Sequence, residues 1–410
     1  MSKSLIVGAL LSAGLLAGGM LMQSGAWSEA AASTATPRLY EQVLARIRHD
    51  FIDSLSIEQM HRKAAFGLVK ELDDPYSALL TPDRVSRLRE QTTGRYAGIG
   101  VEIDIRDGYV TIIAPLSGTP ADSAGIQPGD RIVNVDGKAT HGLTMEEVQQ
   151  AMRGPAGSTM KLTVERANGA DTSFTLRRRI IQFHPVQRTE LLPGNVGYVE
   201  LATFSQDAER ELRGAIDALR GRGARSLILD LRENPGGLLE QGIDVAELFL
   251  DVGQTVASTR GHTPDANNVY EDRFRQAWPQ MPIVALIDSG TASAAEIVAG
   301  ALQDNDRAVI VGSPSYGKGS AQSLFPVTEG HALKLTTARW FTPAGRTIER
   351  DSTSGGITPD VTVRDTSTVP GPVERRLPLA ADPVVTRAHQ LLQGVTTSAE
   401  LRARVPSRPR

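Results

Sequence analysis

The chain has 410 residues and a formal net charge of −3 at pH 7, with 40% hydrophobic and 22% charged residues. This length predicts two or three domains with ordinary buried cores. The small negative charge argues against nucleic acid as the main partner. Because the sequence contains no cysteine, disulfides, thiolate metal ligands and a cysteine nucleophile are excluded.

An apolar run near the N-terminus indicates export. Lys3 precedes residues 5–22, which are rich in Leu, Ala and Gly, and residues 28–30 (Ser-Glu-Ala) have the small residues of a signal-peptidase site. We expect residues 1–30 to be a signal that is cleaved after Ala30. The alternative is an uncleaved anchor, since the run is about long enough to span a bilayer. Both predict a periplasmic protein, or one anchored on the outer side of the cytoplasmic membrane, with no other membrane contact.

Residues 31–93 have a helical pattern in which apolar residues recur at every fourth position. These residues are Leu39, Val43, Ile47 and Phe51. Thr81 and Pro82 predict the cap and first turn of a further helix. We interpret this region as a packing and dimerising helical domain, so the protein could form a homo-oligomer.

Residues 94–180 contain short alternating strands and frequent glycines, which predict one sheet of about five strands with two short helices. Residues 98–101 read Gly-Ile-Gly-Val. Successive N–H groups in such a turn can hold a carboxylate, while the strand that follows pairs with an extended peptide. Together with residues 124–137, this order resembles a PDZ domain, a module that captures C-terminal peptide ends. The resemblance implies a substrate-binding role for Gly98, Ile99, Gly100 and Val101.

Residues 181–368 alternate between apolar strands and amphipathic helices, which predicts a mostly parallel sheet flanked by helices. Ligands of such sheets gather at the carboxyl ends of the strands. Residues 234–237 (Asn-Pro-Gly-Gly) and residues 290–296, which contain Ser293, both fall at such ends.

Ser293 stands where a strand passes into a helix, and Lys318 follows in a glycine-flanked turn. A serine nucleophile needs an adjacent base, and a desolvated lysine can serve as that base. Burial would have to lower the lysine pKa well below its ordinary value of about 10.4. Two other interpretations stay open. Ser293 and Glu296 also spell a helix capping box, and residues 312–320 nearly spell a nucleotide-binding loop, although Gly319 replaces its magnesium-binding Ser or Thr.

On these motifs, residues 40–363 resemble the C-terminal processing peptidases, also called tail-specific proteases. The segments that carry the resemblance are residues 229–238, 292–304, 317–322 and 333–338. The resemblance implies that Ser293 is the nucleophile, that Lys318 is the general base and that Gln322 orients the lysine. It also implies an oxyanion hole formed by the amide of Ala294 and that of Gly236 or Gly237. Thr291 and Ala295 replace serines that are common in the family.

The sequence therefore predicts a multidomain α/β and α+β protein that acts as an exported serine endopeptidase. It would select protein substrates through apolar free C-termini, without metal or cofactor, and an adaptor protein stays open as a partner. The alternative is a catalytically silent PDZ-type scaffold. We expect residues 369–410, which are rich in Pro and Arg, to form a mobile tail.

Overall fold

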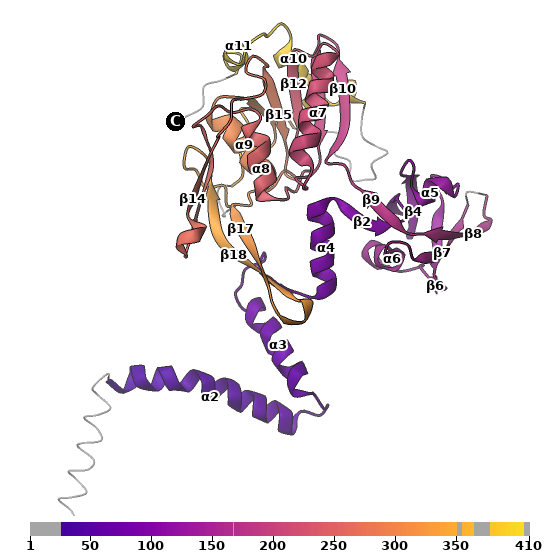
Figure 1. Cartoon of the computed structure of the whole chain (residues 1–410), viewed down its shortest axis with the longest axis vertical. Coiled ribbons are helices and arrows are strands. Elements are labelled where there is room, and N and C mark those ends of the chain that lie inside the picture. The colour runs from indigo at the N-terminus through magenta and orange to yellow at the C-terminus, as the bar shows by residue number, and fades with distance from the viewer. Residues whose placement is uncertain (1–25, 167, 351–354, 365–377, 406–410) are drawn as a thin grey trace, which may run out of the picture. The chain divides into compact units, whose positions relative to one another are not determined.

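The structure is a computed structural model that describes residues 26–166, 168–350, 355–364 and 378–405. The chain divides into two units, residues 1–79 and residues 80–410, and strand β1 (Ala78–Leu80) lies at the division. Figure 1 labels the elements of both units. Residues 1–25 of the predicted signal lie outside the described residues, and its last five residues begin helix α2.

The first unit consists of helices α2 (Ala26–Asp50) and α3 (Ile57–Lys70). Helix α3 begins at a capping box, because Ser56 Oγ accepts from the N–H of Gln59 and the Gln59 side chain accepts from the N–H of Ser56. The apolar residues predicted at every fourth position of α2 are largely exposed. No helix in the described part of the chain is long and apolar enough to cross a membrane.

The second unit begins with helix α4 (Pro82–Thr93), which is followed by a small sheet domain. The sheet has the strand order β3-β4-β5-β7-β8, with β6 paired to β5, and β2 and β9 pair with each other as a separate two-stranded ribbon. The elements are β2 (Arg95–Gly98), β3 (Val101–Arg106), β4 (Tyr109–Pro115), α5 (Pro120–Ser123), β5 (Arg131–Val135), β6 (Lys138–Ala139), α6 (Met145–Met152), β7 (Thr159–Glu165), β8 (Asp171–Arg177) and β9 (Arg179–Gln182).

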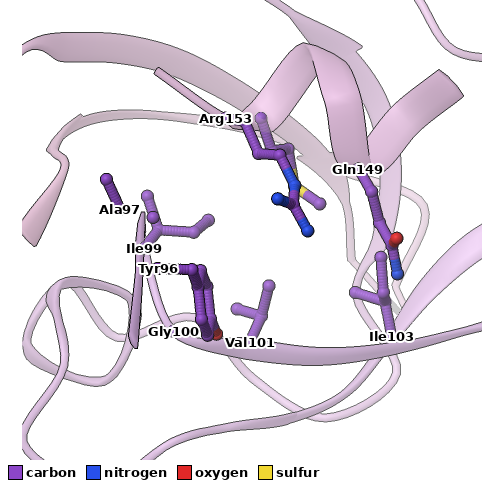
Figure 2. Close-up of a pocket in the computed structure, with 10 residues that line it drawn as sticks. Tyr96, Ala97, Ile99, Gly100, Val101, Ile103, Gln149 and Arg153 are labelled. Atoms are coloured by element: carbon purple, nitrogen blue, oxygen red, sulfur yellow. The ribbon is translucent and has the colours of Figure 1, made fainter. Parts of the chain in front are cut away.

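A groove on this domain lies beside strand β3 and helix α6. Ile99, Val101 and Ile103 line it from the strand side, and Gln149 and Arg153 line it from the helix side (Figure 2). Strand β3 can pair with an extended peptide because it is an edge strand, bonded in its sheet to β4 alone.

The remaining chain forms a six-stranded sheet with the order β10-β11-β12-β15-β16-β19. Within this sheet, β11, β12, β15, β16 and β19 are parallel, and β10 joins as an antiparallel edge. The strands are β10 (Val186–Leu192), β11 (Val196–Leu201), β12 (Ser226–Asp230), β15 (Ile283–Ile287), β16 (Val309–Gly312) and β19 (Val361–Thr362). The multidomain α/β and α+β class predicted from the sequence is confirmed.

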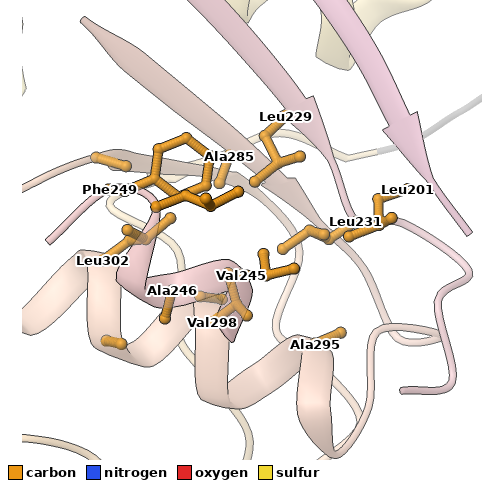
Figure 3. Packing of buried hydrophobic residues seen from close by; sticks show 14 of the residues in the cluster. Leu201, Leu229, Leu231, Val245, Ala246, Phe249, Ala285, Ala295, Val298 and Leu302 are labelled. Carbon is orange, nitrogen blue, oxygen red and sulfur yellow. The ribbon is translucent and has the colours of Figure 1, made fainter. Parts of the chain in front are cut away.

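Both faces of this sheet are buried, as the apolar strands predicted. In β12, Leu227 and Leu229 belong to one apolar cluster and Ile228 to the opposite one, because successive strand side chains point to opposite faces. The first cluster packs under helices α7 (Ala208–Gly221), α8 (Leu239–Glu247) and α9 (Ala294–Asp304). Figure 3 shows Leu229 of the sheet and Val245 and Val298 of the helices within this cluster.

The opposite face is covered by helices α10 (Pro383–Leu392) and α11 (Ser398–Arg402). The prediction of a mobile tail is therefore wrong for residues 378–405. These helices bury Val384, Val385 and Leu391 against the sheet, which would otherwise expose an apolar face to water. The rest of the predicted tail, residues 369–377 and 406–410, lies outside the described residues.

A second, antiparallel sheet contains β13 (Thr255–Gly261), β14 (Asn268–Glu271), β17 (Ser320–Pro326) and β18 (Ala332–Phe341). Strand β18 pairs with both β13 and β17. Strand β17 begins directly after the loop that contains Lys318, so this sheet positions one end of that loop.

Candidate active site

Ser293 lies in the turn between β15 and α9, where its backbone has φ +55° and ψ −117°. A non-glycine residue rarely adopts such a conformation, which costs on the order of 1–3 kcal/mol. Hydrogen bonds hold the turn in place. Thr291 Oγ1 donates to the carbonyl of Leu231 at 2.8 Å, and the N–H of Ser293 donates to Glu296 Oε2 at 2.7 Å. The half-buried serine is thus fixed at the carboxyl end of a central strand.

Glu296 joins the serine turn to the lysine loop, residues 313–319. Its side chain is fully buried in α9. Oε2 accepts from the N–H groups of Ser293 (2.7 Å) and Lys318 (3.0 Å). Oε1 accepts from Ser315 Oγ (2.5 Å) and from the N–H of Gly317 (2.7 Å). Burial raises the pKa of Glu296, and these donors oppose the rise because they stabilise the carboxylate.

The backbone of Lys318 is also held from the other side of its loop. The buried Trp340 on β18 donates its indole N–H to the carbonyl of Lys318 at 2.9 Å, and its backbone N–H to the carbonyl of Gly319 at 2.9 Å. The N–H of Tyr316 donates to the carbonyl of Thr291 at 2.9 Å. The loop is therefore bonded directly to the serine turn, and the lysine side chain is half-buried.

The two candidate oxyanion glycines differ in what their N–H groups bind. The N–H of Gly236 donates to Asn234 Oδ1 at 2.9 Å. The N–H groups of Gly237 and Ala294 have no acceptor among the residues that the structure describes. A Cβ on Gly236 would lie 2.9 Å from both the nitrogen of Ala294 and the Cβ of Ser293. The loop therefore packs against the serine turn, and its geometry favours Gly237 as the second donor.

The glycine loop of the small domain also leaves N–H groups without partners. The carbonyl of Ile99 accepts from the N–H of Ala121 (2.9 Å), and the carbonyl of Gly100 accepts from Leu116 (2.9 Å) and Thr119 Oγ1 (3.0 Å). The N–H groups of Ile99 and Gly100 have no acceptor within the described residues. Gly100 has φ +77°, which favours glycine.

Comparison with known proteins identifies both domains. The profile of peptidase family S41 matches residues 195–363, and that of the PDZ domain matches residues 111–166. A carboxy-terminal-processing protease of Bartonella bacilliformis is 36% identical over 331 residues, which cover 79% of this chain and 74% of that protein. The carboxyl-terminal-processing protease of Synechocystis is 39% identical over 315 residues, which cover 74% of this chain and 72% of that protein. The chain belongs to the carboxy-terminal processing proteases.

A solved structure agrees with this fold. A protein described as a putative S41 protease from Bacteroides fragilis aligns with a TM-score of 0.52 at 18% identity, covering 87% of this chain and 97% of that one. The resemblance predicted from the sequence is confirmed, and the protein is a serine-type protease of family S41 with a PDZ domain.

Gln322, the predicted orienting residue of this protease, lies on β17 next to a bulge in its pairing with β18. Its side-chain amide donates to Ser320 Oγ at 3.1 Å and to Thr336 Oγ1 at 3.3 Å. These bonds fix the side chain three positions beyond the lysine loop. Its role toward Lys318 stays a prediction.

Sequence reasoning missed part of the site. Glu296 was interpreted only as a capping partner of Ser293, although a carboxylate inside an otherwise apolar helix signals a buried polar contact. The sequence analysis also gave no role to Asp230 and Arg232, which are bonded to each other directly before residues 233–237. Within the described ranges, no group of three or more His, Cys, Asp or Glu residues could hold a metal ion.

Proposed function

We propose that this protease cleaves proteins by a Ser293–Lys318 dyad after its PDZ domain has bound the free C-terminus of the substrate. The observation that carries the proposal is the bonding of both loops to one carboxylate. Glu296 fixes the backbone N–H groups of Ser293 and Lys318 on a single oxygen. A nucleophile and a base that act together need this kind of fixed relation.

The chemistry follows from the groups in the site. The amine of Lys318 takes the proton of Ser293 Oγ, which attacks the peptide carbonyl. The N–H groups of Ala294 and Gly237 stabilise the oxyanion. Lys318 then protonates the leaving amine, and the acyl-enzyme forms on Ser293. The lysine next activates a water molecule that releases the product.

The PDZ groove supplies recognition. The carboxylate of the substrate accepts from the N–H groups of Ile99 and Gly100, and its last side chain lies among Ile99, Val101 and Ile103. Apolar final residues are preferred because burial of their side chains in this groove is favourable. We infer an exported protein from the apolar run in residues 5–22.

The dyad is tested by Ser293→Ala, Lys318→Ala and the double variant. We expect each single change to lower the rate of hydrolysis of a peptide with a free apolar C-terminus by at least about 10⁴-fold. The double change should lower that rate little further. Lys318→Arg should also be inactive, because arginine stays protonated. Hydrolysis that survives in Lys318→Ala contradicts the dyad. A wild-type protein that binds the peptide without cleaving it would instead be a silent scaffold.

A further inference from the structure

We propose that Asp382, at the start of helix α10, is a positioning residue for the oxyanion loop, residues 233–237. Asp382 lies beyond the segment that matches family S41, which ends at residue 363. The inference rests on the proposed function, since it concerns the N–H of Gly237 as an oxyanion donor.

The first step is the ion pair between Arg232, which follows strand β12, and Asp382, which begins helix α10. Arg232 Nη2 donates to Asp382 Oδ2 at 2.8 Å and to Asp230 Oδ2 at 2.7 Å. Arg232 Nε donates to both oxygens of Asp230 at 3.0 and 3.1 Å. The exposed fractions of the Arg232 and Asp382 side chains are 13% and 11%. Burial disfavours the charged guanidinium, but the two carboxylates outweigh it and raise the pKa of Arg232.

The second step is the position of Arg232 in the chain. Arg232 directly precedes Glu233, whose backbone has φ +55°. The N–H of Glu233 donates to Asp288 Oδ1 at 2.9 Å. Two carboxylates therefore fix the start of the oxyanion loop. Asp382 holds the side chain of Arg232, and Asp288 holds the backbone N–H of Glu233. We expect a displacement of Arg232 to shift the loop that carries the N–H of Gly237, five residues further along the chain, and a misplacement of about 1 Å can cost 10²-fold in rate.

The third step is that Asp382 is itself held in a fixed position. Asp382 Oδ1 accepts from the N–H groups of Val384 (2.9 Å) and Val385 (3.1 Å), so Asp382 caps helix α10. Val384 and Val385 are buried against the sheet. One oxygen of Asp382 thus holds the helix while the other holds Arg232, which links the packed helix to the catalytic loop.

The test uses the full chain and separates the two roles of Asp382, which are to cap helix α10 and to bind Arg232. Asp382→Asn and Asp382→Ser retain a capping acceptor but remove the charge that faces Arg232. We expect both variants to lower kcat toward a peptide with a free apolar C-terminus by roughly tenfold, with KM unchanged. The rate at which a fluorophosphonate labels Ser293 should fall by the same factor, because this reaction needs the oxyanion donors but no peptide recognition.

The matched control is Arg402→Gln. Arg402 on α11 pairs with Asp360 at 3.2 Å, so its loss weakens the same C-terminal segment without touching Arg232. We expect this variant to keep wild-type kcat and labelling. The proposal is overturned if both Asp382 variants keep wild-type kcat, or if Arg402→Gln lowers kcat as much as they do. Absence of labelling in the wild-type protein would instead contradict the Ser293 nucleophile itself.

Discussion

The PDZ loop, residues 98–101, and the oxyanion loop, residues 233–237, both hold out backbone N–H groups, but they are fixed in different ways. The PDZ loop is tied by backbone carbonyls to residues 116–121, which follow closely in the same domain. The oxyanion loop begins at Glu233, whose N–H is held by Asp288, and the residue before it, Arg232, is held by Asp382; both carboxylates come from distant parts of the chain.

This difference fits the tasks that we propose for the two loops. A recognition loop has to fit a ground-state carboxylate, and local backbone bonds are sufficient for that. An oxyanion loop has to match a charge that develops only in the transition state, and catalysis depends on donors whose positions do not change during the reaction. Buried charged contacts supply that fixity, and they make the position of the proposed oxyanion loop depend on residues far along the chain.

The strongest way to test the comparison is to disturb the oxyanion loop sterically. A Cβ in Gly236→Ala would lie 2.7 Å from the carbonyl of Ala292 and 2.9 Å from the nitrogen of Ala294. Because backbone atoms cannot yield cheaply, we expect fluorophosphonate labelling and kcat to fall by about 10²–10³-fold. Gly253→Ala is the control, since its φ of +82° is similar but its Cβ meets nothing within 4 Å. Equal losses in both variants would mean that backbone strain alone is responsible.

A smaller effect is expected from the charge of Glu296. The ionised carboxylate accepts from four donors, so protonation weakens the bonds that align both loops. Because the pKa of Glu296 is raised above its ordinary value of 4.5, labelling should decline as pH falls through a midpoint above 4.5. Glu296→Gln should reduce labelling by about 10²-fold, and the acid limb (the decline at low pH) that is left should be only the one that comes from protonation of the Lys318 amine.

The exposed Glu240 on α8 provides the control for this experiment. Glu240→Gln should keep both the rate and the acid limb of the wild-type protein. An acid limb that persists unchanged in Glu296→Gln would assign the limb to another titrating group, and the charge of Glu296 would then not be what aligns the two loops.

The smallest effect concerns the PDZ loop. A Cβ in Gly100→Ala would lie 2.4 Å from the side chain of Thr119. We expect this variant to bind a free-acid peptide about tenfold more weakly, with fluorophosphonate labelling unchanged. The wild-type protein should prefer the acid over the C-terminal amide by about tenfold, because charge-assisted bonds are the stronger ones, and the variant should lose that preference.

Gly108→Ala serves as the matched control for the PDZ loop, because its φ of +78° is nearly the same and its Cβ meets open space. Calorimetry with the acid and amide peptides gives the affinities directly. Equal affinity of the wild-type protein for both peptides would remove the carboxylate-binding role from residues 98–101.

The local features of the site could be predicted from the sequence, and its long-range contacts could not. Ser293 and Lys318 stand in turns that glycines and apolar strands make visible. The choice between Gly236 and Gly237 depends on where the side chain of Asn234 points, and no sequence pattern contains that information. The bonds between Glu296 and the lysine loop are likewise tertiary contacts, because strand β16 lies between helix α9 and that loop in the sequence.

The fold was predicted well where periodicity was strong and poorly where composition misled. The buried strands and helices α7 to α9 followed from their apolar patterns. Helix α10 was missed because Pro and Arg in residues 369–410 suggested a mobile segment. A local signal was present, since Asp382 and Pro383 form a normal helix start before Val384, Val385 and Ala388.

The burial of one sheet face by α10 and α11 has a consequence for the timing of activity during synthesis. These helices leave the ribosome after every residue of the proposed dyad and oxyanion hole. Until they emerge, Ile228, Val284 and Leu286 lack their cover, and the domain cannot complete its folding as a unit. The newly made chain therefore completes this domain only after residues 383–402 have emerged, which delays the proposed activity until that point.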